Sequence, residues 1–297
     1  MTHSVHGDYM ICNLCPRKCN AKRDEKSAQG FCKCTDTMKV AKIAPHLWEE
    51  PCISGEKGCG AVFFSGCTLK CVYCQNFEIS HENNGYDITP FELAEKLKEL
   101  EQSGVHTIEF VSGAQYADKI IETLDIYKPS VPLIYNTSGF ESVETLRKLE
   151  KYIDVYLPDF KYSDDELAKR LSGCENYTQT VTDAIEEMLR QQPVLSFDEN
   201  GIIKKGVIIR HLVLPNHTKN SIGVLNIIKD NFDDKTLISL MGQYIPYGKA
   251  FEHEDINRKI TKREYNKVLD HLVELELDGF AQELESADKS YIPKWEY

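Results

Sequence analysis

The sequence lacks long apolar runs, an excess of basic over acidic residues, and first residues that resemble a secretory signal. No apolar segment approaches the roughly 20 residues that cross a bilayer, and no basic stretch followed by an apolar core opens the chain. Asp and Glu number 47 against 35 Lys and Arg, and the net charge of -12 argues against nucleic acid or an anionic membrane as the main partner. We therefore expect a soluble, cytoplasmic protein.

Repeats, low-complexity tracts and long linkers are absent as well, whereas cysteine is plentiful. The 297 residues include 11 cysteines, ten of which lie between Cys12 and Cys74. In a reducing cytoplasm, cysteines serve as ligands or catalytic groups more often than as disulfides. Cys52 has no close cysteine partner in the sequence, and Cys174 stands near the expected end of a helix. The other cysteines form an N-terminal group and a second group that ends at Cys74.

Strand-like and helix-like segments alternate from residue 61 onward. Strands are expected at residues 61–65, 107–112, 131–136, 153–160, 206–215 and 237–244. Thr89, Pro90 and Glu92 predict a capped helix start after the first strand, and a final helix is expected at residues 261–277. Because each helix must return the chain to the same sheet, the alternation predicts parallel strands, in a doubly wound sheet or in a full or partial barrel.

Polar residues at the strand ends favour the barrel. They are Ser112, Gly113, Asn136, Thr137, Asp159, Lys161, Gln243 and Tyr244. In β/α barrels the functional site is built at this edge from several strands, and eight units are needed to close the barrel. We therefore expect an α/β fold with a partial (β/α)6 barrel, open on one side, over residues 59–250. A cysteine-rich extension at 1–58 precedes it, and a helical segment at 251–297 follows.

The stretch FFSGCTLKCVYCQN places three cysteines, Cys67, Cys71 and Cys74, where the first strand ends. A structural zinc site usually takes four protein ligands, whereas a cubane iron–sulfur cluster held by three thiolates keeps one iron open for a substrate or cosubstrate. Tyr73 is placed to pack against such a cofactor. The alternative is a structural zinc or ferredoxin-type site that borrows a fourth ligand such as Cys59.

This stretch resembles the C-x3-C-x-aromatic-C signature of radical S-adenosylmethionine (SAM) enzymes. Over residues 58–250 the chain is similar to the glycyl-radical-enzyme activases, in the branch of pyruvate formate-lyase activating enzyme. The resemblance implies a [4Fe–4S] cluster whose open iron binds SAM, and an electron donor such as flavodoxin or ferredoxin. It also implies that SAM is cleaved to methionine and a 5′-deoxyadenosyl radical, which abstracts hydrogen from the substrate.

The same resemblance implies residues that bind SAM. Asn76 matches an asparagine beside SAM in the activases. Gly113, within VSGAQ, matches one glycine of the family's Gly-Gly-Glu motif, whose backbone receives the methionyl amine. Asn136, within NTSG, corresponds to the family's Thr-Asn-Gly loop.

At the later strands, Asp159 and Lys161 match an Asp-x-Lys of the family, and Arg210 matches the arginine of its fifth strand. We expect Lys161 and Arg210 to hold the SAM carboxylate, and Asp159 to hold the lysine or to accept from the ribose. Gln243 stands where the family has a histidine near the adenosine. His211 should point to the opposite face from Arg210, since side chains alternate along a strand.

The N-terminal group predicts a second metal site. Cys12, Cys15, Cys19 and Cys32 are separated by two, three and twelve residues, and Cys34 is the alternative fourth ligand. Zinc and an auxiliary iron–sulfur cluster are both open, with zinc slightly favoured because a tight knuckle plus a distant cysteine is common in structural sites. The group precedes the SAM motif, whereas the ferredoxin insert of larger activases follows theirs.

The segment between the two cysteine groups carries His46, Trp48, Glu49 and Glu50. We expect a connector strapped across the barrel, and the alternative places the two acids near the radical site.

Three classes of function remain: radical chemistry on a protein, as a glycyl-radical activase performs; radical chemistry on a peptide or small metabolite; and non-catalytic metal binding or electron transfer. Release of 5′-deoxyadenosine from SAM would exclude the third.

Overall fold

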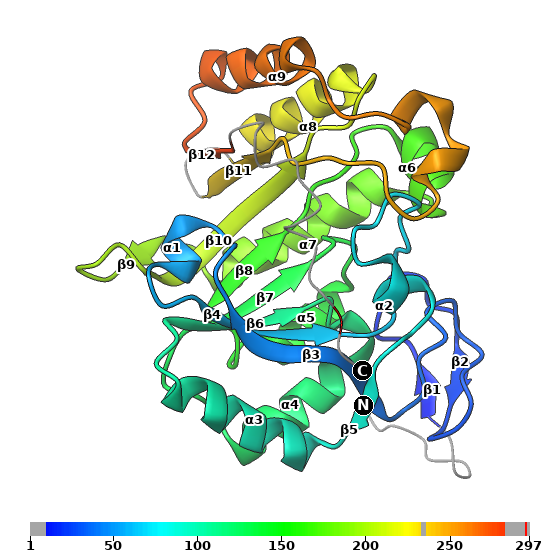
Figure 1. Ribbon diagram of the computed structural model, residues 1–297, viewed down its shortest axis with the longest axis vertical. Helices are drawn as coiled ribbons and strands as arrows, with labels where there is room; N and C mark the ends of the chain where they lie inside the picture. Colours follow the sequence, from blue (N-terminus) through cyan, green and yellow to red (C-terminus); the bar gives the residue numbers. More distant parts are fainter. Residues whose placement is uncertain (1–9, 233–235, 283–294, 296–297) are drawn as a thin grey trace.

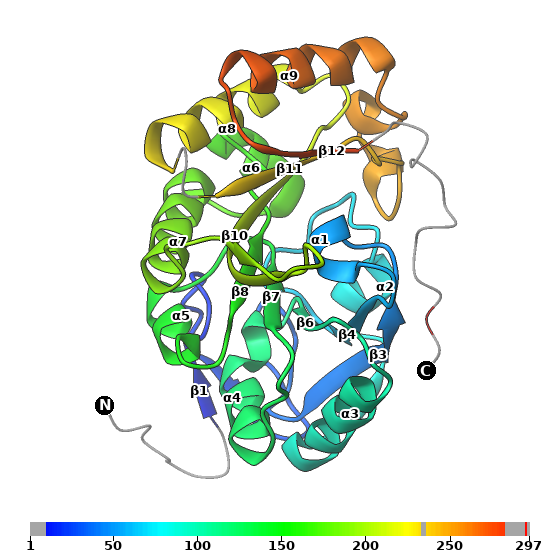
Figure 2. The ribbon, with the colours of Figure 1, turned by 90° about the vertical axis from the view of Figure 1, so that its left-hand side faces the viewer.

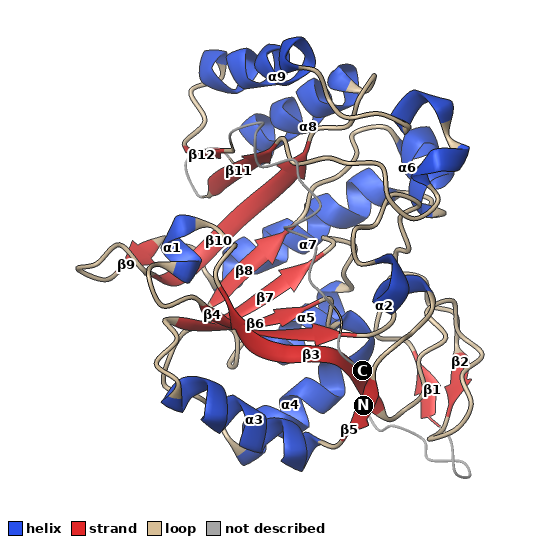
Figure 3. Cartoon of the chain, in the orientation of Figure 1, coloured by secondary structure: helices blue, strands red, loops and turns tan. Residues whose placement is uncertain are grey.

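The computed structural model describes residues 10–232, 236–282 and 295, and one large sheet organises the chain (Figure 1, Figure 3). Nine of its strands follow the order β12-β11-β10-β8-β7-β6-β4-β3-β5, and β9 pairs with β10. The predicted strands are its centre: β4 (Cys59–Phe64), β6 (Thr107–Val111), β7 (Leu133–Thr137), β8 (Val155–Pro158), β10 (Ile203–Leu212) and β11 (Leu237–Met241). Each pairs in parallel with its neighbour, so the prediction of six parallel strands is confirmed.

Helices cover one face of this sheet. They are α3 (Pro90–Gln102), α4 (Ala117–Ile126), α5 (Val143–Leu149), α6 (Asp165–Ser172), α7 (Tyr177–Gln191), α8 (Thr218–Asn231) and α9 (Lys262–Glu274). Their apolar residues pack in one core with alternate strand residues such as Val62, Phe64 and Phe110. Figure 2 shows the helices around the outside of the strands.

The other face of the sheet forms a second apolar core, built from Ala61, Phe63 and their counterparts on the neighbouring strands. The short helix α1 (Pro51–Ser54) packs here through Cys52 and Ile53. The ring of Trp295 meets that of Phe63 edge to face at 5.4 Å. Because the long helices pack on one face only and the sheet stays open, the fold is a partial barrel and not a doubly wound sheet.

Further strands lie outside the predicted pattern. β3 (Met38–His46) runs antiparallel to β4 and carries β5 (Tyr86–Ile88) on its other edge, while β12 (Gly279–Ala281) pairs in parallel with β11. β1 (Met10–Cys12) and β2 (Ala21–Arg23) form a separate two-stranded sheet, and β9 (Ser196–Phe197) pairs with β10. Residues on both sides of the expected 59–250 unit therefore join its sheet, and the domain bounds stay a prediction.

Helix ends follow the local sequence. The side chain of Thr89 accepts from the backbone N–H of Glu92, whose carboxylate accepts from the backbone N–H of Thr89, so the predicted capping box is confirmed. Thr261 and Glu264 form the same arrangement at the start of α9. Short segments complete the chain: α2 (Phe77–His81) and the 3-10 turns η1 (Ala114–Tyr116), η3 (Ala250–Glu252) and η4 (Glu254–Ile256). Among the helices in the described ranges, none combines the length and apolarity that a membrane crossing needs.

Candidate active site

The loop after β4 presents the three cysteines of the SAM motif as free thiols. Each sulfur already accepts hydrogen bonds. The backbone N–H groups of Leu69 and Lys70 donate to Cys67 Sγ over 3.3 and 3.4 Å. The hydroxyl of Ser172 donates to Cys71 Sγ over 3.0 Å, and that of Ser80 to Cys74 Sγ over 3.3 Å. Donors aimed at sulfur favour the thiolate, which is the form that binds iron.

The burial of these thiols fits a metal cluster as well. Burial raises the pKa of Cys71, and it raises that of Cys74 to about 12, so neither thiolate is stable here without a cation. Three cysteines on one loop can reach three corners of a cubane, so the residues of the loop fit a [4Fe–4S] cluster.

A continuous polar network crosses the open face of the sheet. Arg210 on β10 donates from Nε to Asp159 Oδ1 over 3.0 Å and from Nη2 to Asn136 Oδ1 over 2.6 Å. Lys161 Nζ donates to Asp159 Oδ2 over 2.5 Å. Asn136 Nδ2 donates to Glu109 Oε1 over 2.7 Å. The predicted residues Asn136, Asp159, Lys161 and Arg210 therefore come from three different strand ends and meet in one network.

The charges in this network are set by mutual contact. Burial alone would raise the pKa of Asp159, but Lys161 and Arg210 outweigh it and hold the pKa below its usual value. Burial likewise opposes the charge of Lys161, yet Asp159 raises the lysine pKa above the ordinary value. Asp159 thus stays ionised between two cations, and the cluster carries one more positive than negative charge before its other acids are counted.

Those other acids are Glu49, Glu109 and the buried Glu50, which lies near enough to raise the pKa of Arg210. Glu49 Oε2 accepts from Arg210 Nη1 over 3.2 Å, and its Oε1 lies 3.8 Å from His46 Nε2. Burial and neighbouring Glu109 raise the pKa of Glu49, and burial raises that of Glu109 to about 7. Both carboxyls therefore hold a proton more readily than an exposed glutamate does, and Asp159 is the anion that bonds Lys161 and Arg210.

Sequence reasoning missed Glu109 and gave Glu49 only as the less expected alternative. The signal for Glu109 was present: it is the one charged residue in the strand TIEFV, and it shares a face with the buried Thr107 and Val111. The segment from His46 to Gly58 does cross the open face, and it also brings Glu49 into contact with Arg210.

The remaining predicted residues lie around the cysteine loop. Asn76 precedes the first turn of α2 without capping it, and Gly113 precedes η1. The side-chain amide of Gln75 donates to the backbone carbonyl of Gln243 over 3.3 Å, which joins the loop to the end of β11. Tyr73 bonds the hydroxyl of Tyr162 over 2.7 Å. The described contacts bring neither Asn76 nor Gly113 to the Arg210 network.

Two further residues considered from the sequence, His211 and Cys59, have buried side chains. His211 is fully buried and its Nδ1 lies 2.6 Å from the carbonyl oxygen of Phe160, while burial lowers its pKa to about 4. Cys59 begins β4 and donates to Glu109 Oε2 over 3.6 Å, at the opposite end of the strand from Cys67. Cys59 is thus remote from the cysteine loop along its strand.

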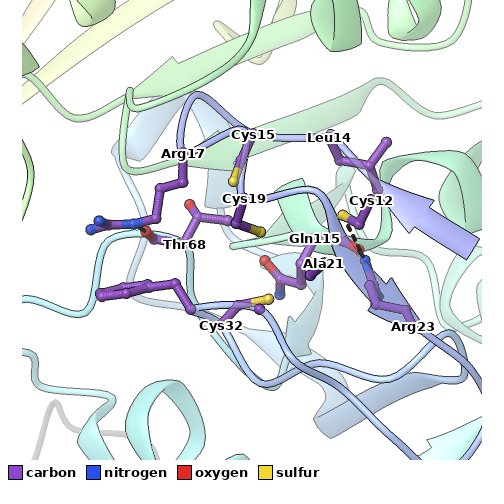
Figure 4. Close-up of a pocket in the computed structure, with 12 residues that line it drawn as sticks. Cys12, Leu14, Cys15, Arg17, Cys19, Ala21, Arg23, Cys32, Thr68 and Gln115 are labelled. Carbon is purple, nitrogen blue, oxygen red and sulfur yellow. Dashed lines mark hydrogen bonds between the residues drawn. The ribbon is translucent and has the colours of Figure 1, made fainter.

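The N-terminal cysteines meet in space. Cys12, Cys15, Cys19 and Cys32 line one pocket, and Figure 4 shows their sulfur atoms directed toward its interior. Cys34 does not line this pocket, although its thiol is in hydrogen-bond contact with that of Cys32 and lies 3.5 and 3.8 Å from the carbonyl oxygens of Cys32 and Ser65. This arrangement favours Cys32 over Cys34 as the fourth member of the group.

An open half-barrel with a three-thiol loop at its carboxyl edge defines a class of enzyme, and comparison with known proteins identifies that class. The family profile of the radical SAM superfamily matches residues 61–225, and the chain belongs to that superfamily. Radical SAM enzymes carry a [4Fe–4S] cluster, which supplies the electron that cleaves SAM. In this chain Cys67, Cys71 and Cys74 are the residues of the motif that would hold it.

Three similar proteins span different parts of the chain. An uncharacterized protein of Methanocaldococcus jannaschii is 31% identical over 277 residues, covering 90% of this chain and 75% of that protein. The pyruvate formate-lyase-activating enzyme of Clostridium pasteurianum is 26% identical over 196 residues, covering 59% of this chain and 80% of that enzyme. A radical SAM methyltransferase from Sphaerobacter thermophilus superposes with a TM-score of 0.52 at 12% identity, over 75% of this chain and 65% of that structure. The last likeness concerns the fold alone.

Proposed function

We propose that this radical SAM enzyme abstracts hydrogen from a glycyl position of a polypeptide, as an activase does. The observation that carries the proposal is the network of Lys161, Asp159 and Arg210 at the same sheet edge as the three-cysteine loop. The similarity to a pyruvate formate-lyase-activating enzyme supports the choice of a protein substrate.

The network is suited to the SAM carboxylate by its charge. Lys161 and Arg210 both bond Asp159, and the raised pKa values of Glu49 and Glu109 favour the neutral forms of those two acids. A carboxylate brought between Lys161 and Arg210 would be paired with two cations, which removes the cost of burying it unpaired. Asp159 then keeps both cations oriented from the far side.

A second candidate is radical modification of a small metabolite or peptide. The buried Glu109 and the partly buried Glu49 on the open face favour it, because their carboxyls would accept hydrogen bonds from an amine or hydroxyl of a small bound substrate. The two candidates share the SAM chemistry and differ in the molecule that loses hydrogen.

The shared chemistry is tested first. After anaerobic reconstitution with iron and sulfide, the protein should convert SAM to 5′-deoxyadenosine and methionine when dithionite is added. Single changes of Cys67, Cys71 or Cys74 to Ala should abolish this product, whereas Cys52→Ala should keep it, because Cys52 is buried in α1 away from the loop. Wild-type turnover in a Cys67→Ala protein would contradict the assignment.

The substrate class is tested with a labelled protein. Pyruvate formate-lyase made with α-deuterated glycine is mixed with the enzyme, SAM and reductant. The activase proposal expects a glycyl radical signal in electron paramagnetic resonance (EPR) and deuterium in the released 5′-deoxyadenosine. Uncoupled SAM cleavage with neither signal would refute glycyl activation of this substrate and favour the second candidate.

A further inference from the structure

The pocket of Cys12, Cys15, Cys19 and Cys32 is a separate site from the SAM loop. We propose that these four thiolates hold a second [4Fe–4S] cluster with every iron ligated by the protein, in place of the zinc ion slightly favoured by spacing. The proposal rests on the radical SAM assignment only for the identity of the first cluster, and it is independent of the substrate.

The convergence of the thiols is the first argument. The four sulfurs line a common pocket and are directed toward its interior (Figure 4). Four thiolates give a cubane one protein ligand for each of its four irons. The pocket therefore offers a complete ligand set, whereas Cys67, Cys71 and Cys74 supply only three thiolates.

The spacing agrees. Cys12, Cys15 and Cys19 are separated by two and then three residues, and Cys67, Cys71 and Cys74 by three and then two. Pro16 follows Cys15 directly, as a proline follows a ligand cysteine in ferredoxin runs. Three corners of a cube can therefore be reached from one short loop at either site, and Cys32 supplies the fourth corner.

Gly30 keeps space open between two of the thiols. A side-chain carbon at Gly30 would lie 3.4 Å from Cys19 Sγ, 3.9 Å from Cys32 Sγ and 3.1 Å from the methyl group of Ala21. Its backbone is not in the left-handed region that requires glycine, so the missing side chain matters for room and not for conformation.

A buried cation faces the pocket without a carboxylate. Arg23 is 2% exposed, and its guanidinium donates to Cys12 Sγ over 3.4 Å and to the backbone carbonyls of Gln115 and Thr35. No Asp or Glu of the described residues forms an ion pair with it within 4 Å. A buried arginine needs a negative partner, and a cubane with four thiolates carries net negative charge.

The site abuts the SAM loop. Arg17, between Cys15 and Cys19, donates from Nε to the carbonyl of Thr68 over 2.5 Å and from Nη2 to that of Ser172 over 3.2 Å. Thr68 follows Cys67 and also lines the pocket, and Ser172 donates to Cys71 Sγ. Two clusters in adjoining loops are close enough to exchange electrons, while the exposed Cys19 and Phe31 bring the second one near the surface.

The test counts metals in two complementary variants of the full chain. Wild-type protein reconstituted anaerobically should hold about eight irons and eight sulfides, and both the Cys15→Ala/Cys19→Ala variant and the Cys67→Ala/Cys71→Ala/Cys74→Ala variant about four. Cys52→Ala is the matched control and should keep about eight. The triple variant, once reduced with dithionite, should show a [4Fe–4S]+ EPR signal that SAM does not change.

Each other outcome has a distinct meaning. One zinc with about four irons in the wild type, or a triple variant without iron, overturns the proposal while leaving the SAM assignment intact. The Cys15→Ala/Cys19→Ala variant could lose all its iron because it fails to fold. In that case iron retained in the triple variant still supports the proposal, since the triple variant tests the second cluster without the other variant. If the triple variant still cleaves SAM, the proposed function is wrong, whereas the proposal of a second cluster is not affected.

Discussion

At the scale of single residues, the side chain of Arg210 links three segments on the open face of the sheet. It donates to Asp159, Asn136 and Glu49, which come from β8, β7 and the segment before α1. Its loss would take one of two cations from Asp159 and the amide oxygen of Asn136 would lose its donor, so the variant should be less stable than the wild type. Lys161 is the better probe of SAM binding, since Asp159 keeps Arg210 when the lysine is removed.

Lys161→Ala should weaken SAM binding roughly tenfold to a hundredfold, because a charge-assisted hydrogen bond contributes about 1.5–3 kcal/mol. The brown absorbance of the cluster should remain, since Lys161 ligates no iron. Lys169→Ala, which removes an exposed lysine paired with Glu175, should bind SAM normally. Titration of the reconstituted proteins with SAM measures both; equal affinity in all three proteins would contradict the proposed role of Lys161.

Glu141 makes stability depend on pH. It is 2% exposed, and burial raises its pKa to about 7 although the Thr137 hydroxyl donates to it. The folded state thus keeps a proton that the unfolded chain releases above about pH 4.5. The stabilisation is full below pH 4.5 and is lost as the pH rises through 7.

Glu141→Gln should remove this loss. Relative to the wild type, the free energy of unfolding of the variant should rise by up to about 3 kcal/mol between pH 4.5 and pH 7.5, as measured by denaturant unfolding. Glu144→Gln is a control of opposite sign, because the Ser142 hydroxyl lowers the pKa of Glu144. Parallel pH profiles for wild type and Glu141→Gln would refute the account.

The sequence predicted much of this site because its residues sit at strand ends. Asn136, Asp159, Lys161 and Arg210 meet since parallel strands end at one edge. Glu109 lies in the middle of a strand, where no strand-end rule applies. Glu49 reaches Arg210 through a segment 161 residues away along the chain, and such a contact leaves no local pattern.

At the scale of elements, α3 illustrates how a short signal fixes a helix start. Thr89→Ala should lower the free energy of unfolding by about 1 kcal/mol, because the backbone N–H of Glu92 loses its acceptor. Thr89→Ser keeps the hydroxyl and should lose much less. Denaturant unfolding compares them, and an Ala variant as stable as the Ser variant would show that the cap contributes nothing.

The six central strands were predictable because each is an apolar run between helices. β3 was not, since it carries Lys39, Lys42 and Pro45 and lies outside the alternation of strands and helices. It is held by a long antiparallel register with β4, from Val40 opposite Phe64 to His46 opposite Cys59. β12 has only three residues, and its pairing with β11 comes from the tertiary fold.

At the scale of the whole molecule, charge is distributed unevenly. The chain carries a net charge of -12, yet residues 17–33 contain six basic and two acidic side chains. This segment surrounds the N-terminal cysteine pocket beside the SAM loop. Apart from the buried Arg23, these basic side chains thus lie around the second cluster that we propose, which Cys19 and Phe31 bring near the surface.

An acidic electron carrier such as flavodoxin would be oriented by this field before contact, and its association rate would depend on ionic strength. The rate of cluster reduction should fall about tenfold between low and high salt. Lys26→Glu should slow it at low salt, while Lys57→Glu, the same exposed charge change placed beyond α1, should not. Equal rates for both variants would remove the argument for steering. The cysteine-rich extension would then have a kinetic consequence. It would orient an approaching acidic electron carrier, although the net charge of the whole protein repels that carrier.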